Sequence, residues 1–361
     1  SGGNYNVVIG DEAGTALTTG DKNTAVGFEA LKTEDANGGH TAIGYQSLKT
    51  LNAGSDSFNT AIGAGAGTAM TTGGNNVIIG GVAGEALTDA DFNVVVGTVA
   101  LRTDTQGSKS TAIGHGTLNA QNFSSATDSH NTAVGYQAGT AITTGVQNTL
   151  IGSTSGDALT DADFNTLVGF GAAATDTKGN KTTALGYQAL GTQNFTSSTD
   201  SHNTAVGYNA GVLLTTGIEN VLIGSLAGDA LTDADFNVAI GVESLGTDTK
   251  GNKTVAIGGG ALNAQNFTSS TDTHNVAVGF HAGNDVTTGI KNTMIGNLSG
   301  DKLTDADLNT AVGYGSLSED IQGSRSTAIG AFALEAQANS SATNADNVGI
   351  GVNAGAFITT G

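Results

Sequence analysis

The sequence contains no cysteine, no proline and no tryptophan, and only 12% of its 361 residues are charged. The absence of cysteine excludes a disulfide framework and thiol catalysis. Basic residues are scarce, with 12 Lys and Arg against 32 Asp and Glu, and the net charge is −20. No basic stripe is available to neutralise phosphates, so we expect no nucleic-acid partner. No run of 18 apolar residues occurs, so we also expect no membrane insertion.

Aromatic residues make up only 5% of the chain, whereas apolar residues of all kinds make up 38% and glycine occurs 56 times. A compact globular core normally uses more aromatic bulk. Small and β-branched apolar residues that recur regularly instead favour a thin, repetitive core. The chain starts without Met and stops within a repeat, so we expect it to be a piece of a longer protein.

An internal repeat runs through the whole sequence. Phrases such as "NTAVGYQAG" (131–139) and "NTAVGYNAG" (203–211) mark 20 units, each centred on a glycine that follows Val, Ile or Leu. These repeat glycines are spaced 17, 17 and 19 residues apart, and then 17, 17, 17 and 21 in a recurring order. Four units therefore form a 72-residue super-repeat, and super-repeats lie near 59–130, 131–202, 203–274 and 275–346. We expect one continuous shaft over residues 1–361.

The residues around each repeat glycine alternate with period two, which is typical of a β-strand. A 17-residue unit is too short for a βαβ unit, so the pattern predicts an all-β parallel β-solenoid with one coil per unit. We expect the residue before the glycine, such as Val134, to fill the interior, and the residue two before it, such as Ala133, to face a sister chain. The reverse assignment is equally consistent with the sequence. The position four after the glycine alternates between Gly and Leu, which predicts a returning strand that shifts register or bulges every second coil.

Asparagine occupies the position four before the glycine in 15 of 20 units. Stacked Asn side chains can form an amide hydrogen-bond ladder, and Asn can equally cap a turn. Both interpretations are structural. The ladder is predicted for the first coil of each super-repeat at Asn59, Asn131, Asn203 and Asn275.

The repeats "NTAVGYQAG", "TALGYQAL" (183–190) and "TAIGYQSL" (41–48) resemble those of bacteriophage tail fibres and the heads of trimeric autotransporter adhesins. The resemblance covers nearly the whole chain. It implies a left-handed parallel β-roll, three copies of which pack side by side in a homotrimeric fibre.

Two recurring segments are candidates for binding. The segment "LTDADFN" spaces oxygen ligands at alternate positions, as calcium loops do, although the Gly and Glu of such loops are missing; the alternative is a capped turn. The calcium candidates are Asp89, Asp91, Asn93, Asp161, Asp163, Asn165, Asp233, Asp235, Asn237, Asp305, Asp307 and Asn309.

The fourth unit carries a loop four residues longer than the others, and this loop contains Phe123, Phe195 or Phe267. Long loops on a rigid solenoid are common binding sites, so these loops are candidates for adhesion to a host surface glycan or receptor. The alternative is that each loop packs over the adjacent coil with its Phe tucked down.

Lys, Arg, His and paired carboxylates form no cluster that occurs only once in the chain, as the residues of a catalytic site normally do. We therefore expect no enzymatic activity and no catalytic residue. The sequence predicts the structural shaft of an extracellular, cell-surface or virion fibre that holds an adhesive tip away from the surface. A subunit of an end-to-end filament is the alternative, and an ice-binding solenoid is a further one.

Overall fold

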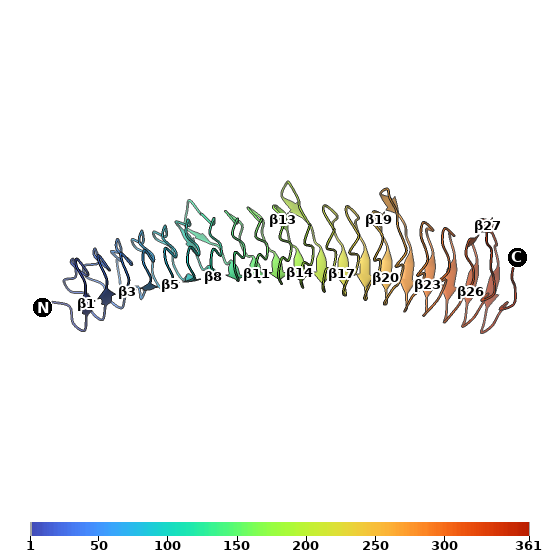
Figure 1. The fold of residues 1–361 in the computed structure, drawn as a ribbon, viewed down its shortest axis with the longest axis horizontal. Helices are drawn as coiled ribbons and strands as arrows, with labels where there is room; N and C mark the ends of the chain where they lie inside the picture. Colours follow the sequence, from blue (N-terminus) through green and yellow to red (C-terminus); the bar gives the residue numbers. More distant parts are fainter. Residues whose placement is uncertain (1, 361) are drawn as a thin grey trace. The chain divides into compact units, whose positions relative to one another are not determined.

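The structure, a computed structural model, describes residues 2–360 as about twenty parallel coils, each marked by one three-residue strand (Figure 1). These residues contain no helix. Successive strands lie mostly 17 residues apart and pair in parallel and in register, so that Thr132 is opposite Thr149 and Val134 is opposite Ile151. The predicted fold, an all-β parallel β-solenoid, is confirmed.

The chain divides into two compact units, residues 1–180 with 196–199, and residues 181–195 with 200–361. Each unit contains ten three-residue strands. The first unit has β1 (Val7–Ile9), β2 (Thr24–Val26), β3 (Thr41–Ile43), β4 (Thr60–Ile62), β5 (Val77–Ile79), β6 (Val94–Val96), β8 (Thr111–Ile113), β10 (Thr132–Val134), β11 (Thr149–Ile151) and β12 (Thr166–Val168). The second has β14 (Thr183–Leu185), β16 (Thr204–Val206), β17 (Val221–Ile223), β18 (Val238–Ile240), β20 (Val255–Ile257), β22 (Val276–Val278), β23 (Thr293–Ile295), β24 (Thr310–Val312), β26 (Thr327–Ile329) and β28 (Val348–Ile350).

Two-residue strands occur only around the long fourth-coil loops of the described chain, which project beyond the other turns (Figure 1). Three parallel pairs join the segment before such a loop to the segment after its tip: β7 (Gly107–Ser108) with β9 (Thr127–Asp128), β19 (Gly251–Asn252) with β21 (Thr271–Asp272), and β25 (Gly323–Ser324) with β27 (Thr343–Asn344). The corresponding strands of the remaining long loop are β13 (Gly179–Asn180) and β15 (Thr199–Asp200).

The strands point their central residue inward and their two flanking residues outward. Ala133 and Leu150 are fully buried, whereas Ile151 is 39% exposed. The expectation that the residue before the glycine fills the interior is therefore wrong, and the reverse assignment holds. Period two allowed both assignments, and the closely packed interior leaves room mainly for Ala at the inward position.

Each strand ends at its repeat glycine, which adopts a φ that only glycine tolerates well. Gly80 has φ +137°, and a Cβ atom there would lie 2.6 Å from the carbonyl oxygen of Gly97 in the next coil. The stacked glycines thus allow the backbone to bend at the same place in every coil.

The segment after the glycine is a series of turns rather than a strand, so the predicted returning strand with a register shift or bulge is wrong. Residues two and four positions after the glycine adopt left-handed backbone conformations, as Gln137 (φ 55°) and Gly139 (φ 59°) do. Alternating left-handed residues cannot form an extended strand.

A large inward residue on a strand is accompanied by glycine at the position four after the repeat glycine. A Cβ atom at Gly139 would lie 2.6 Å from Leu150 Cδ1, so the large inward Leu150 requires glycine there. Leucine occupies the equivalent position in most third and fourth coils of the super-repeats, as at Leu245 and Leu190, which are fully buried. Two alternative sets of side chains therefore fill the interior.

The asparagines four residues before the glycine line the interior of each unit, and all but Asn6 and Asn347 are buried. Asn76 donates its backbone N–H to Asn59 Oδ1 (2.9 Å), and Asn93 donates in turn to Asn76 Oδ1 (2.8 Å). The Asn76 Nδ2 donates to the carbonyl of Ala90 at the far end of its own coil (2.8 Å). Oδ1 accepts from the next asparagine's backbone in the same way at Asn131, Asn203 and Asn275. The column therefore links neighbouring coils and also closes each coil.

Candidate functional site

The fourth coil of each super-repeat departs from the asparagine column, because Ser or Thr replaces the Asn. A buried polar network takes over there. Asp104 is fully buried; its Oδ2 accepts from Gln121 Nε2 (2.6 Å), and its Oδ1 accepts from the backbone N–H of Phe123 (3.1 Å). Gln121 also donates to Ser110 Oγ (3.0 Å) and accepts from Asn131 Nδ2 (2.9 Å). All these groups are buried, and each of these hydrogen bonds compensates for lost hydration.

The same network recurs in the second unit. Gln265 donates to Asp248 (2.6 Å) and to Thr254 (3.1 Å), and it accepts from Asn275 (2.8 Å). Further along the chain, the equivalent residues are Asp320, Gln337, Ser326 and Asn347. The network ties the long loop to the interior, because the loop's own backbone supplies one of the donors to the carboxylate.

The network was not predicted from the sequence, although the sequence contains a pattern that indicates it. The position seven after the repeat glycine holds an aliphatic residue in the first two coils, Asp in the third and Gln in the fourth. Asp104 and Gln121 illustrate the pair. Recurrence of an acid and an amide 17 residues apart, at positions that are apolar elsewhere, indicates a buried hydrogen-bonded pair.

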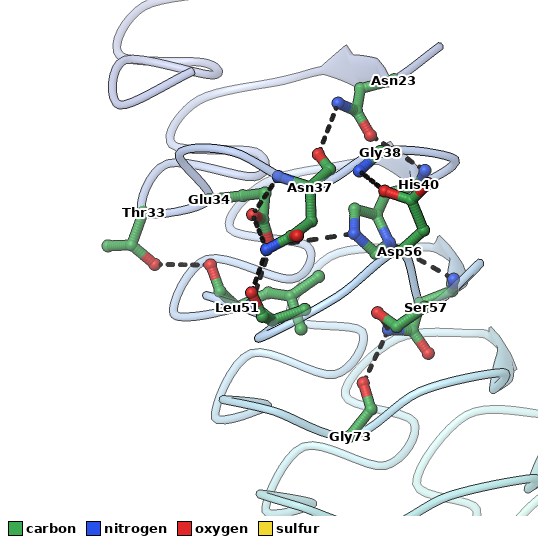
Figure 2. A network of polar contacts seen from close by, with 12 residues as sticks. Asn23, Thr33, Glu34, Asn37, Gly38, His40, Leu51, Asp56, Ser57 and Gly73 are labelled. Atoms are coloured by element: carbon green, nitrogen blue, oxygen red, sulfur yellow. Dashed lines mark hydrogen bonds and ion pairs between the residues drawn. The ribbon is translucent and has the colours of Figure 1, made fainter. Parts of the chain in front are cut away.

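Before the first full super-repeat, the equivalent of this network is built from different residues, which Figure 2 shows. Glu34 replaces the Asp, and its carboxylate accepts from the backbone N–H groups of Asn37 (3.0 Å) and Ala53 (2.9 Å). His40 replaces the Ser or Thr and is fully buried. Its Nδ1 accepts from the backbone N–H of Asn59 (3.3 Å), while its Nε2 lies 3.7 Å from Glu34 Oε2 and makes no hydrogen bond with the described residues.

The environment of His40 favours the neutral imidazole. Burial lowers the pKa of His40 below 6.5, and the negative charges of Glu34 and Asp56 offset only part of this effect. A protonated His40 would form an ion pair with Glu34 but would have to be charged inside the coil. The site therefore couples local stability to pH.

The three aromatic loop candidates, Phe123, Phe195 and Phe267, are buried, with at most 7% of each side chain exposed. Their rings lie beneath the loops and are not displayed to solvent. The exposed atoms of the loop tips belong to small polar residues such as Ser124 and Ser125. Surface ion pairs such as Lys109 with Asp128 (2.5 Å) flank the tips.

The "LTDADFN" segments do not bring their oxygens together. Asp161 accepts from the hydroxyl of Thr160 (3.0 Å), whereas Asp163 accepts from the backbone N–H of Val146 in the preceding coil (2.7 Å), and Asn165 lies in the buried column. The other copies repeat this arrangement at Asp89, Asp91 and Asn93, at Asp233, Asp235 and Asn237, and at Asp305, Asp307 and Asn309. Over residues 2–360, no three His, Asp or Glu side chains are grouped as a metal site would require. The contacts of Asp161 and Asp163 favour the alternative, a capped turn, over calcium binding, which stays a prediction from the sequence alone.

The outward side chains of the strands form what we call the strand face, made of the residues three and one positions before each repeat glycine. It alternates Thr or Val with Ile, Val or Leu. Exposed members include Ile62, Val77, Val94, Ile113 and Ile151 in the first unit, and Leu185, Ile295 and Ile329 in the second.

Aromatic side chains just after the glycine border the strand face. Phe28 stacks on Tyr45 with ring centroids 5.5 Å apart, and Tyr187 stacks on Tyr208 at 5.4 Å. Tyr208 is 54% exposed despite this stacking. The strand face and this aromatic border give each unit an exposed apolar strip, a feature that marks interaction surfaces.

The chain matches no protein-family model and no curated protein sequence. Within residues 2–360, we find no helix that is long and apolar enough to span a membrane.

Proposed function

We propose that this chain is the structural shaft of an extracellular, cell-surface or virion fibre, without catalytic activity, assembled from copies of itself along the strand face. The observation that carries the proposal is the exposed strip of Ile, Val and Leu along each unit. A regular solenoid satisfies its own backbone between neighbouring coils and is stiff for its mass. Such a scaffold suits a spacer that holds an adhesive tip at a distance, and its loops remain candidates for weak contact with a host glycan or receptor.

The strand face supports self-association for two reasons. Its apolar side chains recur at every coil, so two copies that pack side by side can repeat the same contact along their length. Its outward Thr and aliphatic residues also carry no charge, so a chain of net charge −20 would not place like charges against each other at this contact. The resemblance to trimeric fibres favours three copies.

The test is the mass in solution by light scattering, with one pair of matched variants. We expect the wild-type protein to have three times the 35.5 kDa mass of one chain. The double variant Ile113→Lys with Ile151→Lys should produce single chains, because two charges would be buried in each contact. Gln147→Lys is the control and should keep the wild-type mass, because Lys already occupies the equivalent exposed position at Lys109. A wild-type protein with the mass of one chain would refute the assembly.

The same measurement addresses the alternative of an end-to-end filament, for which mass would grow with concentration beyond three chains. Ice binding is tested separately by ice recrystallisation. The outward Thr of β10 and β11 is followed by an outward aliphatic residue, and inhibition that is lost when these Thr residues are replaced would favour that alternative.

A further inference from the structure

A surface depression of about 340 Å³ lies in the second unit where one coil lacks two side chains. Gly259 and Gly260 directly follow the repeat glycine of this coil. The neighbouring coils supply the walls, with Val242 and Glu243 on one side and Phe280 and His281 on the other. A second hollow of about 260 Å³ shares Glu243 with it and adds Asp229.

The lining combines an exposed aromatic ring with carboxylates and contains no Lys or Arg. Phe280 is 55% exposed, and its ring stacks on His281 with centroids 4.0 Å apart. Partial burial raises the pKa of Asp229, and the nearby negative charge of Glu243 raises it further. No Lys or Arg lines either hollow. The carboxylates of Glu243 and Asp229 therefore have no Lys or Arg partner among the residues that line the two hollows.

The repeat provides a matched comparison, because Glu29 occupies the same position of its coil as Glu243. Glu29 accepts from Lys32 (2.6 Å), Lys49 (2.6 Å) and Gln46 (2.7 Å). These hydrogen bonds, above all the one from Lys32, hold the pKa of Glu29 at about 2. At this position the fold can thus surround a carboxylate with cationic and amide donors.

All three of those partners are missing around Glu243. Gly246 stands where Glu29 has Lys32, and Gly260 stands where it has Gln46. Asn263 stands in place of Lys49, and its Nδ2 donates to the backbone carbonyl of Glu243 (2.8 Å) rather than to the carboxylate. The depression is the volume that the absent side chains leave open.

We propose that this depression binds a small organic cation, an alkylammonium or guanidinium group, between the Glu243 carboxylate and the Phe280 ring. The cation takes the place that Gln46 and the Lys49 ammonium occupy beside Glu29, on the side of the following coil. The carboxylates of Glu243 and Asp229 supply charge, and the face of Phe280 supplies a cation–π contact. The proposal does not rest on the assembly of copies along the strand face.

The experiment compares butylguanidinium with its uncharged isostere butylurea, by saturation-transfer NMR at 50 mM salt and pH 7.5. We expect saturable binding of butylguanidinium and at least fivefold weaker binding of butylurea. Glu243→Gln should weaken butylguanidinium binding at least fivefold. The Glu243→Gln variant should fold normally, because Gln137 occupies the equivalent position of another coil with the same left-handed backbone conformation.

Two further variants sharpen the test. Gly246→Lys should weaken butylguanidinium binding at least fivefold, because a lysine at this position can pair with Glu243 as Lys32 pairs with Glu29. The position has no left-handed φ, and the atom nearest to an added Cβ, at 3.0 Å, belongs to the side chain of Asn263. Glu219→Gln removes an equal charge from an exposed site elsewhere in the same unit and should leave binding unchanged. Equal binding of the two probes to the wild-type protein, no binding of either, or undiminished binding to Gly246→Lys would overturn the proposal.

Discussion

Replacing a repeat glycine by alanine should break the stacking of the coils at that point. Gly80 is a suitable site, because it lies within the first unit and its φ is +137°. An added Cβ atom would lie 2.6 Å from both the carbonyl carbon and the carbonyl oxygen of Gly97, whereas ordinary contact begins at 3.4 Å. Both atoms belong to the backbone, so rotation of a side chain cannot relieve the clash.

The cost follows from two contributions. A non-glycine residue at this φ is strained by about 1–3 kcal/mol. Moving the Gly97 carbonyl away also stretches the hydrogen bond from Gly97 N–H to the Ile79 carbonyl (2.7 Å), whose net contribution is about 1 kcal/mol. We therefore expect Gly80→Ala to reduce local stability by about 2–4 kcal/mol. Because coils contact only their neighbours, the loss should be confined to the coils next to position 80.

Hydrogen exchange of the Gly97 amide measures this local stability directly. A loss of 2–4 kcal/mol corresponds to exchange that is roughly 30- to 900-fold faster, at about 1.36 kcal/mol for each factor of ten. Gly54→Ala is the control: a Cβ atom there has nothing within 4 Å, and the backbone is not left-handed, so we expect no loss. Exchange at Gly97 that changes less than threefold in Gly80→Ala would refute the steric reasoning.

Three further predictions concern buried and acidic groups. Asp248→Ala should reduce local stability by about 3 kcal/mol, because it leaves the Nε2 donor of Gln265 buried without its carboxylate; the exchanged pair Asp248→Asn with Gln265→Glu should recover more than half of this in denaturant unfolding. Since burial lowers the pKa of His40 in the folded state, its contribution to stability is fully present above the unfolded value of about 6.5 and is lost as pH falls below it. Exchange of the Asn59 amide, corrected for intrinsic rates, should therefore accelerate between pH 7.5 and 5.5 in the wild type and not in His40→Ser. In the "LTDADFN" segments, Asp161 accepts from the Thr160 hydroxyl and Asp163 from the backbone N–H of Val146, and their carboxylates are not grouped around one point, so we expect melting to be the same with calcium and with chelator; a calcium-dependent rise of several degrees would contradict this.

The coil boundaries could be predicted from the sequence because each is set by one residue type with one physical reason. The repeat glycines are required by the φ and the close approach shown by Gly80, and only glycine satisfies both. The direction of the strand side chains could not be predicted in the same way. Both faces of a strand such as Thr132–Val134 carry an apolar residue, and period two separates the faces without telling which one is inside.

The loops show a different limit. Phe267 in a longer, polar loop could equally be an exposed contact or an anchor, and only the position of the loop backbone decides between them. The network beneath the loop was open to prediction, since Asp248 and Gln265 interrupt a column that is aliphatic in the first two coils of each super-repeat. The depression at Gly259 is harder to recognise, because it depends on which residues of three successive coils face one another.

The period of four coils has a physical explanation in the interior. A buried carboxylate such as Asp248 needs donors, and the nearest interior position of the next coil supplies Gln265, so the polar residues must occur in consecutive coils. The carboxylate also accepts from the backbone N–H of Phe267, which only a loop that turns back over the coil can provide (3.0 Å). The longer loop therefore belongs to the coil with the glutamine, and the other two coils can fill their interior with aliphatic side chains. The loop is fixed from below by Asp248, by its buried Phe267 and by Ser270, which accepts from Asn252 Nδ2 (2.9 Å), so the exposed residues of its tip contribute little to holding it on the coil.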